Sequence, residues 1–362
     1  MSQHPVPETT PESMHRFDCF GGRCTVIVAD GERATDAAAA AAHRALLRRH
    51  DRFSRFAPDS ELSVFNRDPR RTVAVSPLLS RLARAALRAA RDTGGLVDAT
   101  LGAEIERAGY RTSLEGAGIP LSLALALAPP RAAARPADAD PLSRLSVDAE
   151  HGTITRRPGT VFDPGGVAKG VFADELAERL DGFDAFAIDC AGDIRLGGRA
   201  ALERPIHVTS PFDGSRLYTF GLRDGAIATS GIGKRSWLDG DARPAHHLLD
   251  PRTGRPAYTG VVQATALAPT AAEAEALAKA AVLSGPAGAP GWLRHGGMIV
   301  FDDGSYELLG AGDPPTGPSV PTAAPFAPAG TLAGNLSATH PRISVSTASR
   351  SGSLRISWNR SG

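Results

Sequence analysis

Nine consecutive residues, His246 to Gly254, combine the side chains that proton transfer and anion binding require. They read His-His-Leu-Leu-Asp-Pro-Arg-Thr-Gly, so two imidazoles, a carboxylate and a guanidinium surround a Pro/Gly turn. Imidazole exchanges protons near neutral pH more readily than any other side chain. A hydrophobic core does not need this mixture, and we predict a loop that acts on an anionic ligand. The alternative is a capped turn in which Asp250 pairs with Arg252, which leaves the two histidines unexplained.

Two further stretches are rich in glycine and aspartate. The first runs from Asp163 to Gly170 (Asp-Pro-Gly-Gly-Val-Ala-Lys-Gly), and the second contains Gly192-Asp193 after an expected strand. Glycine lets a ligand approach the backbone closely, and a helix that begins there presents free N–H groups to a phosphate. Lys169 adds a positive charge, so we predict a buried phosphate or nucleotide site. The alternatives are a tight strand–helix turn with a surface lysine and, at Asp193, a structural turn.

Two charged residues lie four apart on a helix expected over residues 270–284. Thr270 is the expected N-cap, and Glu273 three residues later has the spacing of a capping box. Glu275 and Lys279 therefore share one face of this helix. From the spacing alone, they are predicted to form a solvent-exposed ion pair.

The composition excludes several classes of protein. The 362 residues carry a net charge of +1, which argues against a nucleic-acid binder or a polybasic membrane binder. No apolar run is long enough for a membrane span, and the first residues lack the apolar segment of a secretory signal. The three cysteines (Cys19, Cys24 and Cys190) have no CxxC spacing and are expected to be reduced thiols. We therefore expect a cytoplasmic protein.

The elements that must position these residues form one predicted domain over residues 16–310. Residues 1–15 are predicted to be a disordered N-terminus, and residues 311–362 a low-complexity, disordered tail with weak strand tendency at 342–345 and 354–358. Residues 117–145, rich in alanine, proline and leucine, form either an ordered insertion or a surface loop, and no helix or strand is assigned to them. The expected helices are 35–52, 77–92, 163–180 and 270–284, and the expected strands are 24–29, a pair over 145–156, 186–189, a pair over 205–222, 226–231, 261–268, 297–301 and 306–309.

Taken together, seven stretches resemble the ApbE family of FAD:protein FMN transferases, and they occur in the family's order. They cover roughly residues 20 to 310, and seven in sequence are far more specific than any one alone. The stretches are 53–66, 95–100, 163–170, 191–194, 228–231, 247–254 and 274–285.

The resemblance implies an α+β fold with a mainly antiparallel sheet core flanked by helices, T-fold-like, with a cleft for FAD. Members of the family split FAD in the presence of Mg²⁺, release AMP and attach FMN to a Thr or Ser of an acceptor protein. By position, the resemblance implies that His247 is the base for the acceptor hydroxyl, with Asp250 beside it as a catalytic residue. The positions implied to contact FAD are Phe56 (in place of the family's usual Tyr), Leu96, Asp98, Asp163, Lys169 and Leu249.

The implied Mg²⁺ site contains a departure from the family's pattern. Gly166 matches a main-chain ligand, but Glu275 and Lys279 stand where the family has an Asp and a Thr. A glutamate still offers oxygen ligands, whereas a protonated lysine offers none. Two outcomes follow: the ammonium takes the place of the metal, or the site is lost and transfer with it. The alternative functions are therefore a catalytically impaired FAD-binding protein and an FAD pyrophosphatase that yields FMN and AMP.

Overall fold

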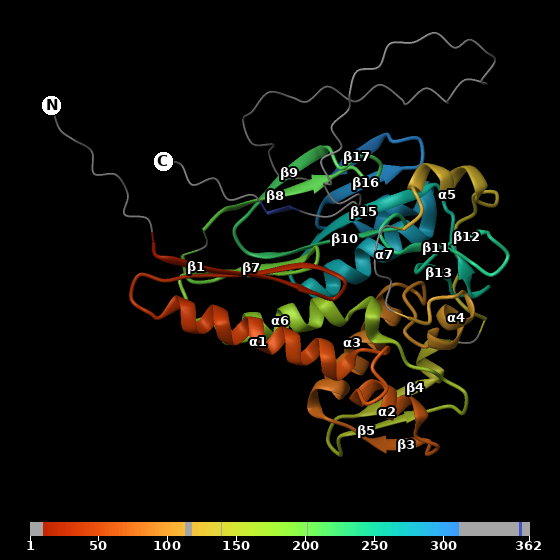
Figure 1. The fold of residues 1–362 in the computed structure, drawn as a ribbon, viewed down its shortest axis with the longest axis horizontal. Helices are drawn as coiled ribbons and strands as arrows, with labels where there is room; N and C mark the ends of the chain where they lie inside the picture. Colours follow the sequence, from red (N-terminus) through yellow and green to blue (C-terminus); the bar gives the residue numbers. More distant parts are fainter. Residues whose placement is uncertain (1–9, 113–117, 139, 201, 311–354, 357–362) are drawn as a thin grey trace, which may run out of the picture.

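The computed structural model describes residues 10–112, 118–138, 140–200, 202–310 and 355–356. Within them, an eight-stranded antiparallel sheet forms the centre of an α+β fold (Figure 1). Its strands, in spatial order, are β1 (Glu12–Cys19), β2 (Gly22–Ala29), β6 (Ala185–Cys190), β7 (Asp193–Gly197), β10 (Gly225–Gly231), β15 (Val261–Ala268), β16 (Gly297–Phe301) and β17 (Tyr306–Leu309).

Three long helices cover one face of this sheet. Helix α1 (Thr35–Phe53) packs on β1 and β2, α6 (Ala168–Leu180) on β6 and β7, and α7 (Ala271–Gly288) on β10 and β15. The hairpin of β8 (Arg204–Thr209) and β9 (Arg216–Leu222) lies on the other side of the sheet from α1 and α6 (Figure 1). Strands β6 and β15 are buried almost throughout because side chains cover both of their faces.

A smaller group of elements packs at one end of the helices. It contains a three-stranded sheet in the order β3–β5–β4 (Figure 1). Helix α2 carries the second half of the 53–66 stretch, and the loop between α3 and α4 carries the 95–100 stretch. Its elements are α2 (Glu61–Arg67), β3 (Thr72–Ala74), α3 (Pro77–Asp92), α4 (Gly102–Arg107), β4 (Leu145–Asp148), β5 (Thr153–Arg156) and the 3₁₀ turns η1 (Pro141–Ser143) and η2 (Pro164–Gly166).

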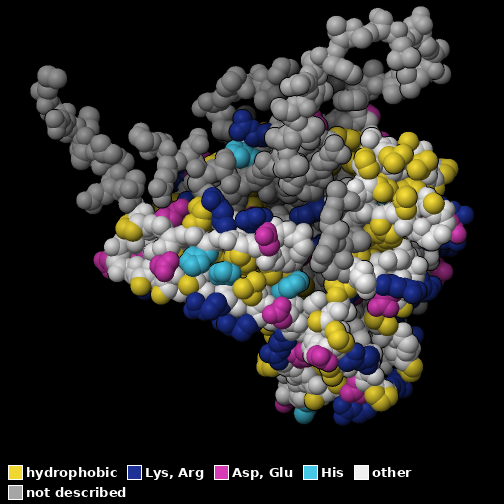
Figure 2. All heavy atoms as spheres, in the orientation of Figure 1, with side chains coloured by type: hydrophobic (Ala, Val, Ile, Leu, Met, Phe, Trp, Pro, Cys, Tyr) yellow, Lys and Arg dark blue, Asp and Glu magenta, His cyan; other side chains and the backbone are white. Residues whose placement is uncertain are grey.

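The remaining elements are short. Around the 246–254 stretch lie α5 (Leu121–Leu127), β11 (Ser236–Leu238), β12 (Pro244–His246), β13 (Leu249–Asp250) and β14 (Arg255–Pro256), whereas η3 (Ala289–Trp292) packs on α7 and β18 (Arg355–Ile356) pairs with β8. Leu123 and Leu127 of α5 are exposed, and Figure 2 shows hydrophobic side chains gathered over this helix. No helix of the described ranges is long and apolar enough to cross a bilayer.

Most of the predicted elements are confirmed, and so is the fold class. The predicted helix over 77–92 matches α3, which Ser76 caps with Pro77 in the first turn. The predicted end at 284 is also confirmed, because Gly285 (φ 72°) breaks the helical path before Pro286. All three cysteines are free thiols, as expected.

One sequence expectation about element positions is wrong. The first strand begins at Glu12, so residues 12–15 do not belong to a disordered N-terminus. They pair with β2 through a two-residue turn in which Phe20 and Gly21 both have positive φ, as a type I′ hairpin turn requires. Helix α5 lies within 117–145, where no element was assigned. The predicted tail falls outside the described residues except for β18, which pairs with β8.

Candidate functional site

Helix α7 brings Glu275 and Lys279 into the interior of the protein. The helix is rich in alanine and lies between β10, β15 and α6, so nearly every side chain from Ala274 to Leu283 is buried. Glu275 is 0% exposed and Lys279 8% exposed, and Lys279 Nζ donates to Glu275 Oε1 at 2.9 Å. The predicted ion pair exists, but its predicted solvent exposure is wrong because the sheet and α6 cover the helix on both sides.

A second ion pair lies beside the first. Lys169, in the first turn of α6, donates to the carboxylate of Asp193 at the start of β7 and lies 3.8 Å from Glu275 Oε1. Glu275 Oε2 in turn accepts from the backbone N–H of Gly170 at 3.0 Å. We call Lys169, Asp193, Glu275 and Lys279 the lysine cluster. Its four side chains come from α6, β7 and α7, which no sequence spacing connects.

The lysine cluster shifts the pKa of each of its members. Burial raises the pKa of Glu275, but the ammonium groups of Lys279 and Lys169 outweigh this effect and leave the pKa below its ordinary value. Burial also raises the pKa of Asp193, to about 6, against the opposing charge of Lys169. The pKa of Lys279 is lowered by burial, whereas Asp193 and Glu275 overcome burial and raise that of Lys169. Asp193 Oδ1 is buried without a hydrogen-bond partner among the residues that the structure describes.

The loop that contains Gly166 lies directly against Lys279. A Cβ on Gly166 would stand 3.6 Å from Lys279 Cε and 3.9 Å from a methyl group of Val97. The three positions with implied roles at Mg²⁺ (Gly166, Glu275 and Lys279) therefore do converge. They do not fit a divalent cation, because both oxygens of Glu275 already accept hydrogen bonds and the third position is an ammonium. The described part of the chain contains no cluster of three His, Cys, Asp or Glu side chains placed to hold a metal.

The Asp98 and Asp163 loops are tied together beside Gly166. Asp163 N–H donates to the Ala99 carbonyl at 2.8 Å, and Asp163 Oδ1 accepts from the N–H of Gly165. Asp98 Oδ1 accepts from the backbone and hydroxyl of Thr100, and Asp98 Oδ2 is buried with no partner in the described segments. Burial raises the pKa of Asp98. Leu96 is buried one residue before Val97.

Phe56 lies in a stack of planar groups rather than alone. The guanidinium carbon of Arg55 is 4.3 Å from the Phe56 ring centre and 4.4 Å from that of Tyr110. Tyr110 stacks on Trp237 with ring centres 5.3 Å apart. Arg55 Nε also approaches Asp163 Oδ2 at 3.4 Å, which connects the stack to the loop before α6.

The paired histidines differ in environment. His246 Nδ1 accepts from the Leu248 N–H at 3.3 Å, its ring packs edge-on against Tyr258, and burial lowers its pKa to about 3. His247 is partly buried, and its Nδ1 has no partner among the described side chains and backbone. Burial, followed by the charge of Arg235, holds the pKa of His247 well below its usual range. His247 is therefore a neutral imidazole at pH 7, able to accept a proton.

Asp250 has the contacts of a turn residue. Its Oδ1 accepts from the backbone N–H groups of Arg252 and Arg135, each at 3.0 Å, and its carbonyl accepts from Gly254. The alternative of a capped turn is thus partly right, although the side chain of Arg252 pairs with Asp138 (3.7 Å) rather than with Asp250.

Two features lie next to this turn. Leu249, the residue before Asp250, is buried and pairs with Pro256. A cavity of about 310 Å³ borders the turn and is lined by Arg107, Arg144 and Arg252 among others.

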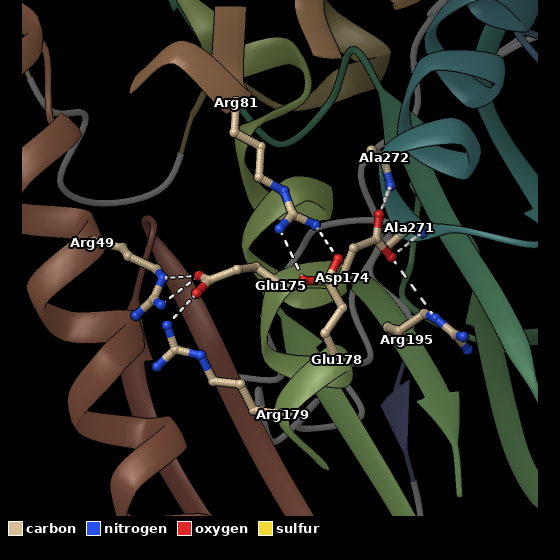
Figure 3. A network of polar contacts seen from close by, with 9 residues as sticks. All are labelled: Arg49, Arg81, Asp174, Glu175, Glu178, Arg179, Arg195, Ala271 and Ala272. Atoms are coloured by element: carbon tan, nitrogen blue, oxygen red, sulfur yellow. Dashed lines mark hydrogen bonds and ion pairs between the residues drawn. The ribbon is translucent and has the colours of Figure 1, made fainter. Parts of the chain in front are cut away.

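Helix α6 is anchored from its other side by a second set of charges. Arg49 of α1 and Arg179 bind Glu175, and Arg81 of α3 binds Glu178, which together form what we call the outer arginine network (Figure 3).

Helix α6 also holds the start of α7. Asp174 of α6 accepts the backbone N–H groups of Ala271 and Ala272 at 2.8 and 3.0 Å (Figure 3). This carboxylate caps α7 and fixes the helix that presents Glu275 and Lys279.

Two further charged residues belong to the site, although neither was among the positions with an implied role. Asp189 of β6 is buried, and burial raises its pKa to about 7. Lys234 Nζ lies 3.4 Å from the Ala191 carbonyl, and burial lowers its pKa to about 8. One signal was available: lysine occurs only at positions 169, 234 and 279, whereas arginine occurs 37 times.

Comparison with known proteins gives a consistent result. A family model described as "ApbE family" matches residues 20–301. The FAD:protein FMN transferase of Treponema pallidum is 29% identical over 245 residues, which cover 63% of this chain and 66% of that protein. That of Haemophilus influenzae is 26% identical over 241 residues, with 62% and 66% covered. The chain thus spans about two thirds of the length of these relatives.

Solved structures show the same fold. The ApbE protein of Thermotoga maritima superimposes with a TM-score of 0.67 at 24% identity, covering 83% of this chain and 97% of that one. The flavin transferase ApbE of Vibrio cholerae gives a TM-score of 0.63 at 23% identity, covering 84% and 98%.

Proposed function

The chain belongs to the ApbE family, and from this premise we propose that it is an FAD:protein FMN transferase. Its substrate is FAD, and its second substrate is a protein that presents a Thr or Ser hydroxyl. The observation that supports this most directly is the position of a neutral imidazole, His247, within the electrostatic influence of Arg235 and Lys279. A base and a group of cations at one place are what attack on a diphosphate needs.

The proposed reaction is a single displacement at phosphorus. The acceptor oxygen forms a bond to the phosphorus of the FMN half, and the bond from that phosphorus to the bridging oxygen breaks. AMP leaves with the bridging oxygen, and His247 takes the proton of the acceptor hydroxyl. Lys169 and Lys279 donate hydrogen bonds to the oxygens of the diphosphate, while Asp250 and Asp98 keep their loops in place.

The remaining implied contacts follow from the same proposal. Leu96 and Asp163 belong to the two loops that are tied together beside Gly166, Leu249 lies in β13 two residues after His247, and Phe56 offers an aromatic ring from the stack with Arg55. The unpartnered oxygen of Asp98 is available to a hydrogen-bond donor of the substrate.

The proposal is tested by incubating the protein with FAD and a purified FMN-accepting domain, with MgCl₂ and separately with EDTA. Covalent flavin on the acceptor is detected by in-gel fluorescence, and AMP by chromatography. We expect His247→Gln to lower the labelling rate by about 10²- to 10⁴-fold, because the general base is removed. His295→Asn, at a histidine that contacts Glu273 at the surface, is the matched control and is expected to keep the rate.

Two results would contradict transferase activity. Release of AMP from FAD without an acceptor, and without labelling when one is present, identifies a pyrophosphatase that uses water as the nucleophile. Retention of FAD without AMP release identifies a flavin-binding protein.

A further inference from the structure

The three lysines of this chain lie together. Lys169 and Lys279 belong to the lysine cluster, and Lys234 contacts the carbonyl of Ala191, two residues before Asp193. Everywhere else the chain uses arginine as its basic residue. An ammonium is a compact point charge, whereas a guanidinium is a broad plane that needs more room. Lysine therefore takes the place of arginine only at this one site, where a compact cation fits.

Glycine backbones provide the space for two of these side chains. A Cβ on Gly166 would stand 3.6 Å from Lys279 Cε, and a Cβ on Gly22 would stand 3.2 Å from Lys234 Nζ. Lys279 thus runs along the 163–166 loop, and its ammonium ends at Glu275.

Each oxygen of Glu275 already accepts a hydrogen bond, one of them from an ammonium, which holds a cation at the place of the metal. Oε1 accepts from Lys279 Nζ at 2.9 Å, and Oε2 accepts from the N–H of Gly170 at 3.0 Å. The two ammonium groups of the lysine cluster also balance its two carboxylates in charge. A divalent ion would have to displace one ammonium and remain close to the other, at a cost that Coulomb repulsion in a buried site makes large.

From these contacts we propose that Lys279 is a built-in cation. Together with Lys169 it donates hydrogen bonds to the diphosphate oxygens of a flavin dinucleotide, and the protein binds this substrate without a divalent metal at Glu275. This inference rests on the proposed function, because it takes FAD as the substrate, and it goes further by removing the metal from the site.

Selective labelling tests the inference in the wild-type protein. Because the chain has three lysines, ¹³Cε-lysine labelling gives three side-chain NMR signals, each assigned by its loss in K169R, K234R or K279R. We expect FAD to shift the Lys279 signal in EDTA, and MgCl₂ without FAD to leave it in place. We also expect the Kd for FAD to agree within about twofold in EDTA and in MgCl₂.

A substitution at Lys279 tests whether loss of the ammonium makes the site dependent on a metal. Lys279→Thr removes the ammonium and offers a hydroxyl oxygen, so the cluster gains a net negative charge. We expect this variant to bind Mn²⁺ stoichiometrically, as measured by electron paramagnetic resonance, and to bind FAD at least tenfold more tightly in MgCl₂ than in EDTA. Wild-type protein is expected to bind no more Mn²⁺ than FAD alone does.

The outcomes separate the two proposals. Stoichiometric Mn²⁺ binding by the wild type, or a tenfold loss of FAD affinity in EDTA, overturns the built-in cation and leaves the transferase proposal intact. No binding of FAD under either condition overturns both. The wild-type measurements need no substitution, so they decide the question even if Lys279→Thr does not fold.

Discussion

Helix α6 separates two groups of charges that differ in chemistry and completeness. The outer arginine network uses planar guanidinium groups; Glu178 and Arg179 are more than half exposed, whereas the pair of Arg49 and Glu175 is largely buried. The lysine cluster on the other side uses ammonium groups and is buried, and Asp193 keeps one oxygen without a partner in the described structure.

The comparison distinguishes charged residues that stabilise the fold from charged residues that form a ligand site. The exposed pair between α3 and α6 (Arg81 with Glu178) contributes little to stability, whereas the buried pair of Arg49 with Glu175 joins α1 to α6 and has all of its charges partnered. Buried pairs are costly to form and strongly destabilising to break, so a buried cluster with an unsatisfied oxygen indicates a site that receives a ligand.

The largest expected effect comes from breaking the lysine cluster. Lys169→Met removes the partner of Asp193 and leaves a buried carboxylate, which we expect to lower the free energy of unfolding by about 3–5 kcal/mol at pH 8. The loss is expected to be smaller at pH 5, where Asp193 is protonated. Urea unfolding at the two pH values measures it, and an equal loss at both would mean that the charge of Asp193 in the folded protein does not change between them.

The next effect concerns Asp189, whose pKa in the folded protein is about 7 instead of 3.8. The folded state binds more protons than the unfolded state between these values, so this group makes the wild type less stable as pH rises through this window. Asp189→Asn still accepts from the Gly192 N–H and does not titrate. We expect the variant to match the wild type near pH 4 and to exceed it by about 2–4 kcal/mol at pH 8. A pH-independent difference in urea unfolding would contradict this.

A smaller effect is expected at Asp174, the residue of α6 that binds the start of α7. Asp174→Ala removes the acceptor for two N–H groups at the start of α7, and we expect a loss of about 0.5–2 kcal/mol in the free energy of unfolding. Because α7 carries Lys279, FAD affinity is expected to fall as well. An unchanged affinity with lowered stability would show that α7 is positioned by packing alone.

The smallest effect is expected in the outer arginine network. Arg81→Gln breaks the pair with Glu178, both of which are partly exposed, and we expect a change of about 0.2–1 kcal/mol with unchanged FAD affinity. Thermal unfolding and FAD titration check this. A loss as large as that of Lys169→Met would remove the contrast between the two sides of α6.

Local signals account for what the sequence predicted well. Ser76 and Pro77 at the start of α3, and Thr270 at the start of α7, act within one helical turn, so their effect is visible in the sequence. Strand β1 was missed because it is an edge strand with mostly partly exposed side chains, and its position depends on pairing with β2. Helix α5 was missed because its flanks are alanine- and proline-rich and give no clear periodic boundary.

The sequence predicted which residues belong to the site, but not how their side chains contact one another. Spacing placed Glu275 and Lys279 on one helical face, and the family resemblance gave each implied residue a role. Neither revealed that the pair is buried, that Asp193 completes it, or that Asp189 and Lys234 lie beside it. Asp250 was predicted to be catalytic because of its place in the 246–254 stretch. The sequence did not reveal that its Oδ1 accepts the backbone hydrogen bonds of a turn.

The sequence alone determined the order of the elements, the glycine-rich loops and the rare use of lysine, since each depends on residues close along the chain or on composition. Only the tertiary structure decided which charges meet, because Lys169, Asp193 and Glu275 come from α6, β7 and α7. Their pairing follows from how the two helices pack on the sheet, and burial then makes an ordinary i,i+4 pair into the cation of a buried site.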